Sequence, residues 1–430
     1  MSNLWYPRKE SPLLGLTGMG GGVGALMWAG ATSVGPFDLW CCGENEYGDL
    51  GQNKAEADLV RVSSPVQIPG NWIQMSAPGY TSTFGIKADK VGEGGTLWAW
   101  GQNQYGNLGL NEGGNPGPWK SSPTQVGSYD DWVYVSSNSF ETFGVRSPGA
   151  LYAWGRNFDG YALGINQPSN SHKSSPTQIP GTWRADAYSV RATGNGGMAI
   201  SSSNDLYTWG NNQQGQLMKN TSGLTPGVPD GSPTPQLIPG NWKGLMGGSG
   251  GVNFVFDTSN QLWACGTGGK GTSPNSRVSS PVQVPGTWVT NAGGPASEQR
   301  LLSYCGNDHK LALYNESVPS NYLKAWGYNS QGQLGTRNTT AYQDSVAYVY
   351  PNFGNVVSVA ANGTSSAVVK TDGTLWGWGS DFGKFAVPGK NYGTPNTIER
   401  YSAPIQIGTH TDWYSVNMNK GTWFGFREQA

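Results

Sequence analysis

The sequence has little charge of either sign. Asp, Glu, Lys and Arg make up 12% of its 430 residues, and the formal net charge is −1. Nucleic-acid binding normally requires a basic surface that displaces counterions, and the chain has no run of Lys or Arg. We therefore expect no nucleic-acid partner. No stretch approaches the ~18 apolar residues of a membrane-spanning helix, so no membrane span is expected either.

The first residues, MSNLWYPRKESPLLGLTGMGGG, lack the continuous apolar segment of a secretory signal. This absence predicts that the protein is made in a cytoplasm without an export signal. Where it acts afterwards is a separate question.

Cysteine and histidine are scarce, and neither is placed for catalysis or metal binding. The four cysteines include no CxxC pair and stand at Cys41, Cys42, Cys265 and Cys305. None of the three histidines belongs to an HExxH or nucleophile motif, and they are His172, His309 and His410. We expect no catalytic residue, no cofactor and no metal, and we do not expect an enzyme.

Glycine, proline and aromatic residues are abundant instead, with 66 Gly, 27 Pro, 19 Trp and 20 Tyr. Disordered chains are poor in aromatic residues. Turn residues that separate aromatic runs are typical of many short strands, and no helical periodicity is visible.

A degenerate repeat runs through most of the chain. Its clearest form, LWAWGQNQYGNLG at 97–109, recurs seven times, and its central glycines are 52 to 61 residues apart. These anchor glycines are Gly43, Gly101, Gly155, Gly210, Gly266, Gly327 and Gly379. A second signature, such as SSPTQIPGTW at 174–183, follows all of them except the sixth.

Each repeat predicts about four short strands. The Leu-Trp-Ala-Trp run favours a strand with both faces buried. The anchor glycine suits a positive φ or a close backbone approach, and the following NxxG has turn chemistry. Proline in SSP extends the residue before it, and Pro-Gly fits a type II turn before the next strand. Four strands in ~56 residues are expected of a propeller blade.

The two ends of the chain look complementary. The C-terminal YSVNMNKGTWFGFREQA offers two strands without a following LWxWG, and the LWCCG at 39–43 has no clear pair of strands before it. We therefore predict an all-β, seven-bladed β-propeller over residues 39–430, closed by a blade that both ends share. Sharing would remove open sheet edges. Residues 1–38 form a glycine-rich N-terminal arm in this prediction.

The LYxWGxNxxGQLG signature with its proline-containing link resembles the regulator of chromosome condensation repeat, over about residues 39–426. The resemblance implies a seven-bladed propeller. It implies less about function, because the family includes a nucleotide-exchange factor, ubiquitin-ligase modules and a secreted β-lactamase inhibitor, and fold does not give function.

The residue before the anchor glycine varies in an informative way. It is tryptophan in five repeats, at Trp100, Trp154, Trp209, Trp326 and Trp378. Cys42 and Cys265 replace it in the other two. Either these thiols form a reactive site, or a smaller apolar residue fills the same packing position, and we favour packing.

The loops are rich in small polar residues and aromatic rings, as in adaptable recognition surfaces. The predicted interaction face comprises Tyr47, Tyr105 and Phe158, and the alternative is that these rings pack within their own turns. Such a surface, with no signal and an apolar arm, favours a bacteriophage virion component, either tail- or fibre-associated or a capsid decoration. Its partners would be other virion proteins and a host-surface glycan or protein. The predicted docking residues of the arm are Trp5, Tyr6, Arg8 and Trp28. The alternative is an intracellular protein–protein scaffold or inhibitor that uses the propeller face.

Overall fold

The computed structural model divides into two compact units, Met1–Ser33 and Val34–Ala430. The structure describes parts of the second unit only. The described residues are 35–54, 59, 61–76, 82–89, 94–112, 118–138, 140–187, 189–220, 230–249, 251–272, 276–289, 303–305, 309–317, 320–349, 353–380, 400–419 and 421–429.

One sheet contains seven strands in the order β26-β27-β1-β2-β3-β4-β5. The bounds of these strands are β1 Phe37–Glu44, β2 Arg61–Met75, β3 Ser82–Lys87, β4 Thr96–Gly101, β5 Lys120–Gln125, β26 Trp413–Met418 and β27 Thr422–Glu428. The first part of β2 pairs with β1, and its last part, from Trp72 to Met75, pairs with β3.

Five further sheets contain four strands each, in chain order. The first two comprise β6 Trp132–Asn138, β7 Glu141–Arg146, β8 Ala150–Gly155 and β9 Lys173–Ile179, then β10 Val190–Ala192, β11 Gly196–Ile200, β12 Leu206–Asn211 and β13 Gly231–Ile238. The third comprises β14 Trp242–Ser249, β15 Val252–Asp257, β16 Leu262–Gly266 and β17 Val278–Val284. The last two comprise β18 Ser303–Cys305, β19 His309–Ser317, β20 Ser320–Tyr328 and β21 Tyr342–Tyr348, then β22 Val356–Asn362, β23 Ser365–Lys370, β24 Leu375–Ser380 and β25 Arg400–Ile407.

Strands account for nearly all regular structure in the described ranges, which otherwise contain one 3-10 turn, η1 at Phe158–Gly160. The prediction of an all-β fold is therefore confirmed. No helix in these ranges is long and apolar enough to cross a membrane.

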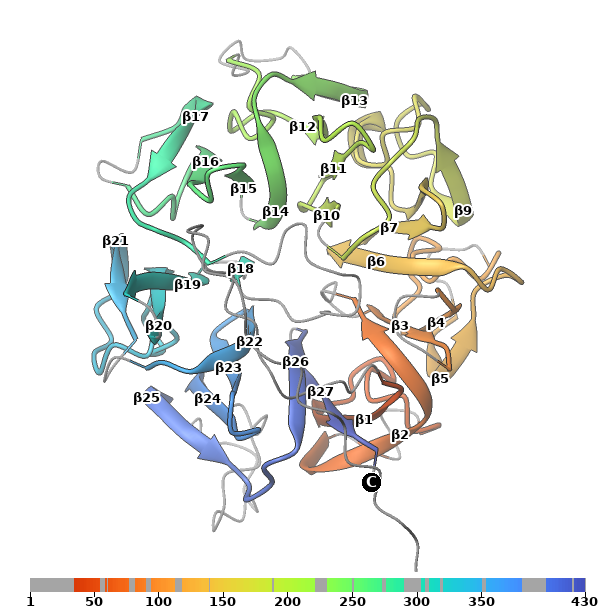
Figure 1. Ribbon diagram of the computed structural model, residues 1–430. Helices are drawn as coiled ribbons and strands as arrows, with labels where there is room; N and C mark the ends of the chain where they lie inside the picture. Colours follow the sequence, from red (N-terminus) through yellow and green to blue (C-terminus); the bar gives the residue numbers. More distant parts are fainter. Residues whose placement is uncertain are drawn as a thin grey trace, which may run out of the picture. The chain divides into compact units, whose positions relative to one another are not determined.

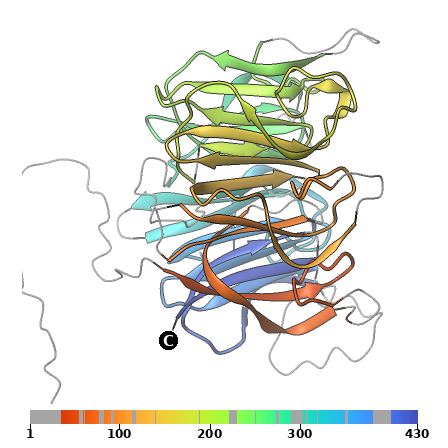
Figure 2. The same cartoon turned by 90° about the vertical axis from the view of Figure 1, so that its right-hand side faces the viewer.

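The sheets of Val34–Ala430 lie side by side around a common centre, with β6, β10, β14, β18, β22 and β26 nearest to it (Figure 1). Neighbouring sheets stack face to face, as the side view shows for the yellow and gold strands (Figure 2). The core lies between them: Phe143 and Val145 of one sheet pack with Ala199 and Trp209 of the next in one apolar cluster.

Hydrogen bonds join the innermost strands of neighbouring sheets. The backbone N–H of Ala192 donates to Ser136 Oγ (3.1 Å), and that of Val416 donates to Ser358 Oγ (3.2 Å). Asn417 Nδ2 donates to the carbonyl of Met75 (3.5 Å), so β26 near the C-terminus also contacts the end of β2.

The two ends of the described chain meet in one sheet. β1 pairs antiparallel with β27 from Phe37 opposite Glu428 to Gly43 opposite Thr422. The prediction that both ends build one sheet is confirmed. Since β1 begins at Phe37, the first strand includes two residues of the predicted arm 1–38, while residues 1–34 lie outside the described ranges.

All seven anchor glycines have φ between +93° and +128°. This region is costly for any residue with a Cβ. Space is limited as well, because a Cβ on Gly155 would lie 2.1 Å from the carbonyl oxygen of Phe140, and one on Gly266 would lie 2.0 Å from that of Gly251. The anchor position requires glycine for both reasons.

The asparagine of each NxxG turn holds its own loop closed. Asn103 is fully buried, and its Oδ1 accepts the backbone N–H of Leu108 (3.0 Å). The same bond recurs in the pairs Asn45–Leu50, Asn157–Leu163, Asn212–Leu217 and Asn329–Leu334.

In four repeats, the tryptophan before the anchor glycine connects the repeat to the one before it. Trp100 Nε1 donates to the carbonyl of Asp49 (2.9 Å) in the preceding loop. Three further bonds are equivalent: Trp154 to Asn107, Trp326 to Gly269 and Trp378 to Gln333. Trp209 differs, since its Nε1 has no hydrogen-bond partner among the described residues. The loop before it has one extra residue between Asn157 and Leu163.

The SSP signature makes a second connection between repeats. Asn111 has φ +57°, its backbone N–H donates to the carbonyl of Ser174 (2.7 Å), and its Oδ1 accepts the hydroxyl of Ser175 (3.1 Å). The N–H bond recurs at Asn53–Ser121, Asn220–Ser279 and Arg337–Ser402. This bond therefore links the residue two positions after the first signature of one repeat to the second signature of the next repeat.

The two cysteines that replace tryptophan lie fully in the core. Cys265 Sγ donates to the carbonyl of Gly215 (3.0 Å), also in the preceding loop, and Cys42 Sγ donates to that of Val62 (2.9 Å). Burial raises the pKa of the Cys265 thiol to about 12. A thiol that stays protonated is a poor nucleophile, so this geometry agrees with packing rather than with a reactive site.

Candidate interaction surface

The loops that follow β1, β4 and β8 carry the three aromatic residues of the predicted interaction face. In each case the loop is fixed by the buried asparagine described above and rests on the SSP strand of the next repeat. The backbone therefore holds Tyr47, Tyr105 and Phe158 in defined positions, and each of these side chains is half-buried.

The structure brings Tyr105 and Phe158 together through a cation. The guanidinium carbon of Arg156 lies 4.4 Å from the ring centre of Phe158 and 5.0 Å from that of Tyr105. Tyr105 also meets Phe140 edge-on at 5.0 Å and His172 at 4.9 Å. Such stacking neutralises none of the arginine's charge but holds its plane in place.

Tyr47 belongs to a second group. Its ring meets Trp119 edge-on at a centroid distance of 4.9 Å, and Trp119 is 50% exposed. No ring contact between Tyr47 and Tyr105 is found in the described ranges. We define the loop surface as Tyr47, Trp119, Tyr105, Phe140, Arg156 and Phe158.

Two titratable groups lie at the Arg156 cluster. Burial, together with the charge of Arg156, lowers the pKa of His172, whose Nδ1 accepts the backbone N–H of Asn157 (3.2 Å). Burial raises the pKa of Glu141 to about 7, although backbone hydrogen bonds and Arg156 oppose this shift. The histidine is thus an uncharged acceptor near neutral pH, and Arg156 supplies the positive charge of the cluster.

Sequence reasoning missed Trp119, Phe140 and Arg156. Trp119 lies in NPGPWK, between the two repeat signatures, and Arg156 occupies the variable position of WGxN. A large aromatic in a turn-rich link was the available signal for Trp119. The predicted docking residues Trp5, Tyr6, Arg8 and Trp28 lie outside the described residues.

The arrangement offers aromatic rings and a fixed guanidinium. Within the described part of the chain, no group of three His, Cys, Asp or Glu side chains could hold a metal ion. His309 is fully buried, with its Nε2 2.7 Å from Ser366 Oγ, and burial lowers its pKa to about 3. This histidine contributes to packing between sheets rather than to a surface site.

Sheets of four strands around a centre, joined by bonds between successive repeats, define a repeat protein of the propeller class. Residues 94–142 match the regulator of chromosome condensation (RCC1) repeat. The structure of yeast RCC1 (Prp20) bound to Kap60 is similar to this chain, with a TM-score of 0.72, 17% identity and coverage of 93% of this chain and 90% of that one. The chain therefore carries the RCC1 repeat and has the fold of RCC1-like propellers.

Two relatives are similar to this chain in sequence. The RCC1 domain-containing protein RUG3, mitochondrial, of Arabidopsis thaliana is 22% identical over 74% of this chain and 67% of its own length. The human E3 ubiquitin-protein ligase HERC2 is 28% identical over 50% of this chain, a match that spans only 4% of HERC2. Neither the structure nor these relatives support the predicted virion role.

Proposed function

We propose that Val34–Ala430 form a closed propeller of seven blades that acts as a protein-binding module, and that the loop surface contacts the partner. The count of seven rests on β2, which pairs with β1 and β3 in turn and so serves two sets of four strands in the seven-stranded sheet. The bond between Asn417 and Met75 supports closure between the last set and the set that begins in β2.

The observation that carries the binding role is the composition and order of the loop surface. Trp, Tyr and Arg are the residue types most enriched in the centres of protein interfaces. Here Trp119 is half-exposed against Tyr47, and Arg156 is flanked by Tyr105 and Phe158. Rings already fixed by neighbours lose little freedom when a partner binds.

A protein partner agrees with the neighbouring structure, in which yeast RCC1 is bound to another protein, Kap60. The proposal corresponds to the scaffold alternative of the sequence analysis and assigns no catalysis. The virion role and the docking arm remain predictions without support.

Affinity capture with matched variants tests the proposal. The full chain, the double variant Trp119→Ala/Arg156→Ala and the control Leu237→Ala would be immobilised and exposed to lysate of the source cells, with bound proteins quantified by mass spectrometry. Leu237 is 55% exposed and lies in β13, outside the loop surface.

We expect at least one protein that the unaltered chain and Leu237→Ala retain equally and that the double variant loses about thirtyfold, as for a hot spot of about 2 kcal/mol. A near-ultraviolet circular dichroism spectrum would verify that the double variant is folded. Equal retention of every bound protein by all three chains would refute the assignment of the loop surface.

A further inference from the structure

A basic side chain fills the same position in several repeats. Lys87 Nζ lies 4.4 Å from the ring centre of Trp72 and 4.1 Å from that of Trp98. In each such position, one ring comes from the tryptophan after the Pro-Gly or loop turn, and the other from the second residue of the LWxWG strand.

Two arginines repeat this arrangement. Arg146 lies 6.0 Å from the Trp132 ring and 5.5 Å from the Tyr152 ring. Arg427 does the same in the last set of strands, 5.5 Å from Trp413 and 5.0 Å from Trp40. We call this position, between the two rings at the end of the second strand, the cation slot.

Strand register identifies the equivalent residue as the one that stands opposite the tryptophan. Lys87 pairs with Trp72, Arg146 with Trp132, and Arg427 with Trp413. By the same pairing, the residue opposite Trp183 is Ser201. The short serine cannot reach across the rings of Trp183 and Tyr207, which still meet edge-on at 5.4 Å.

Other departures from the pattern are filled from within. Asp257 stands opposite Trp242 and accepts the Nε1–H of Trp263 (2.9 Å). In the repeat after that, Tyr314 stands opposite Trp288, and Lys324 Nζ lies 3.3 Å from the Tyr314 ring centre. In contrast to Asp257 and Tyr314, the side chain of Ser201 is too short to bond to or cover the second ring of its slot.

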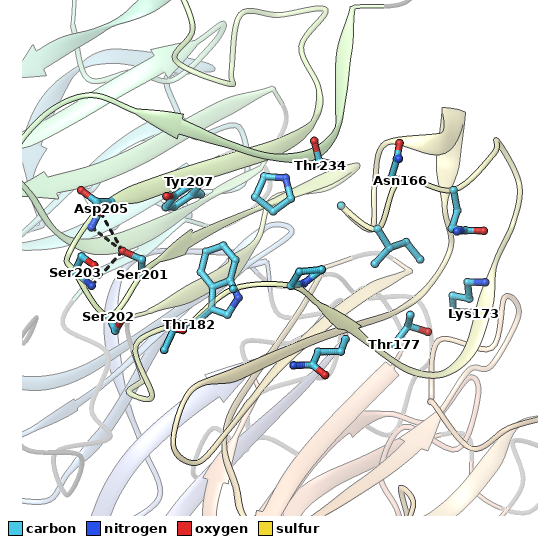
Figure 3. A pocket seen from close by; sticks show the side chains of 18 residues that line it. Asn166, Lys173, Thr177, Thr182, Ser201, Ser202, Ser203, Asp205, Tyr207 and Thr234 are labelled. Atoms are coloured by element: carbon cyan, nitrogen blue, oxygen red, sulfur yellow. Dashed lines mark hydrogen bonds between the residues drawn. The ribbon is translucent and has the colours of Figure 1, made fainter.

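A cavity of about 630 Å³ lies at the Ser201 slot, within the usual range of ligand sites. Trp183 and Tyr207 line it together with Pro180 and Pro235. Figure 3 shows Ser201, Asp205 and Tyr207 grouped at one end of the cavity, with Lys173 and Asn166 at the other.

Asp205 places a carboxylate in this cavity, where it could pair with a bound cation. The two arginine slots use carboxylates in this way: Asp131 binds Arg146 through two bonds of 2.6 and 3.0 Å, and Asp412 binds Arg427. Thr182 replaces this aspartate before Trp183, but Asp205, two residues before Tyr207, supplies a carboxylate to the same end of the cavity. Lys173 lies at the opposite end, away from this group.

We infer that the Ser201 slot binds an arginine side chain of a partner protein, which takes the place that Arg146 and Arg427 occupy in their own repeats. The planar guanidinium would stack on the half-buried Tyr207 ring, at the edge of the buried Trp183, and pair with Asp205. The Ser201 slot is separate from the loop surface. The inference rests on the proposed function only in that the arginine belongs to a protein.

A small probe tests the slot without any partner. N-acetyl-arginine amide and its uncharged analogue N-acetyl-citrulline amide would each be titrated into the full chain, with the indole N–H signal of Trp183 followed by NMR. Trp183→Phe identifies that signal. We expect a saturable shift with the arginine probe and an affinity at least about tenfold weaker for citrulline, as for loss of the charge.

Three variants sharpen the result. Ser201→Arg should fill the slot from within and abolish the response, while Asp205→Asn should weaken arginine binding by about threefold or more. Arg146→Ser should empty a second slot and make the Trp132 signal respond to the arginine probe. A wild-type Trp183 signal that does not respond, one that responds equally to citrulline, or one that persists in Ser201→Arg would overturn the inference. That outcome would leave the proposed role of the loop surface unaffected, because the capture experiment tests that role independently.

Discussion

The connection between repeats can be measured with one matched pair of substitutions, Trp100→Phe and Trp209→Phe. Both tryptophans are fully buried before an anchor glycine. Each packs edge-on against a tryptophan of its own repeat and a phenylalanine of the adjoining set of four strands, namely Trp72 and Phe424 for Trp100, and Trp183 and Phe143 for Trp209. The loss of ring volume is therefore similar.

The two sites differ in one hydrogen bond. Trp100→Phe removes the bond to the Asp49 carbonyl, a loss of about 1 kcal/mol that also leaves a buried acceptor unpaired. Trp209→Phe removes a buried N–H that has no partner in the described ranges, which relieves a penalty of ~1–3 kcal/mol. Trp100→Phe should therefore destabilise the protein by about 2–4 kcal/mol more than Trp209→Phe.

Equilibrium urea unfolding followed by far-ultraviolet circular dichroism gives the two free energies of unfolding. Trp378→Phe is the control, since Trp378 Nε1 also donates to the preceding loop (2.8 Å) and should behave like Trp100. An equal loss of stability in Trp100→Phe and Trp209→Phe, or a larger loss in Trp209→Phe, would refute the view that these bonds stabilise the packing of successive repeats.

Three further outcomes are expected. Gly155→Ala should cost more than ~2 kcal/mol of stability in thermal unfolding, because its Cβ would lie 2.1 Å from the Phe140 carbonyl, whereas Gly127→Ala, with φ +62° and open space around it, should cost about 1 kcal/mol. Burial raises the pKa of Glu141 from 4.5 to about 7, so the folded state holds a proton that the unfolded chain releases between these values. Stability should thus fall by at most about 1.4 kcal/mol per unit as pH rises from 4.5 to 7 and then level off, and Glu141→Gln should remove this slope in pH-dependent melting. Iodoacetamide should leave Cys41, Cys42 and Cys265 unmodified by mass spectrometry until the protein unfolds, because all three are fully buried; rapid labelling of native Cys265 would contradict its place in the core.

Much of the fold could be predicted because the residues that connect successive repeats recur in the sequence. Asn111, Ser174 and Ser175 have counterparts at the same positions of other repeats. The counterparts recur because successive repeats are joined by the same hydrogen bonds. The glycine requirement at Gly155 was likewise visible from the position of glycine alone. Sequence patterns suffice to predict the structure where the same interactions recur from repeat to repeat.

The candidate sites were less accessible for a physical reason. Arg156 became part of the loop surface only when Tyr105, from a different sheet, came to lie beside it. The slot at Ser201 is visible only through register, because serine opposite Trp183 has meaning when lysine or arginine stands there in other repeats. Both proposed sites depend on departures from the repeat, which the repeat pattern by itself does not predict.

The pairing of β1 with β27 has a consequence for how the protein is made. During synthesis, Phe37–Glu44 leaves the ribosome long before Thr422–Glu428. The edge of β1 that pairs with β27 therefore stays open until β27 has been made. Local pairs such as β7 with β8 can form as translation proceeds, whereas this pair closes a loop of most of the chain and comes late. A nascent chain therefore carries an open strand edge until Thr422–Glu428 has been added, and a message truncated before Thr422 would yield a product that offers this edge to chaperones, proteases or other copies of itself.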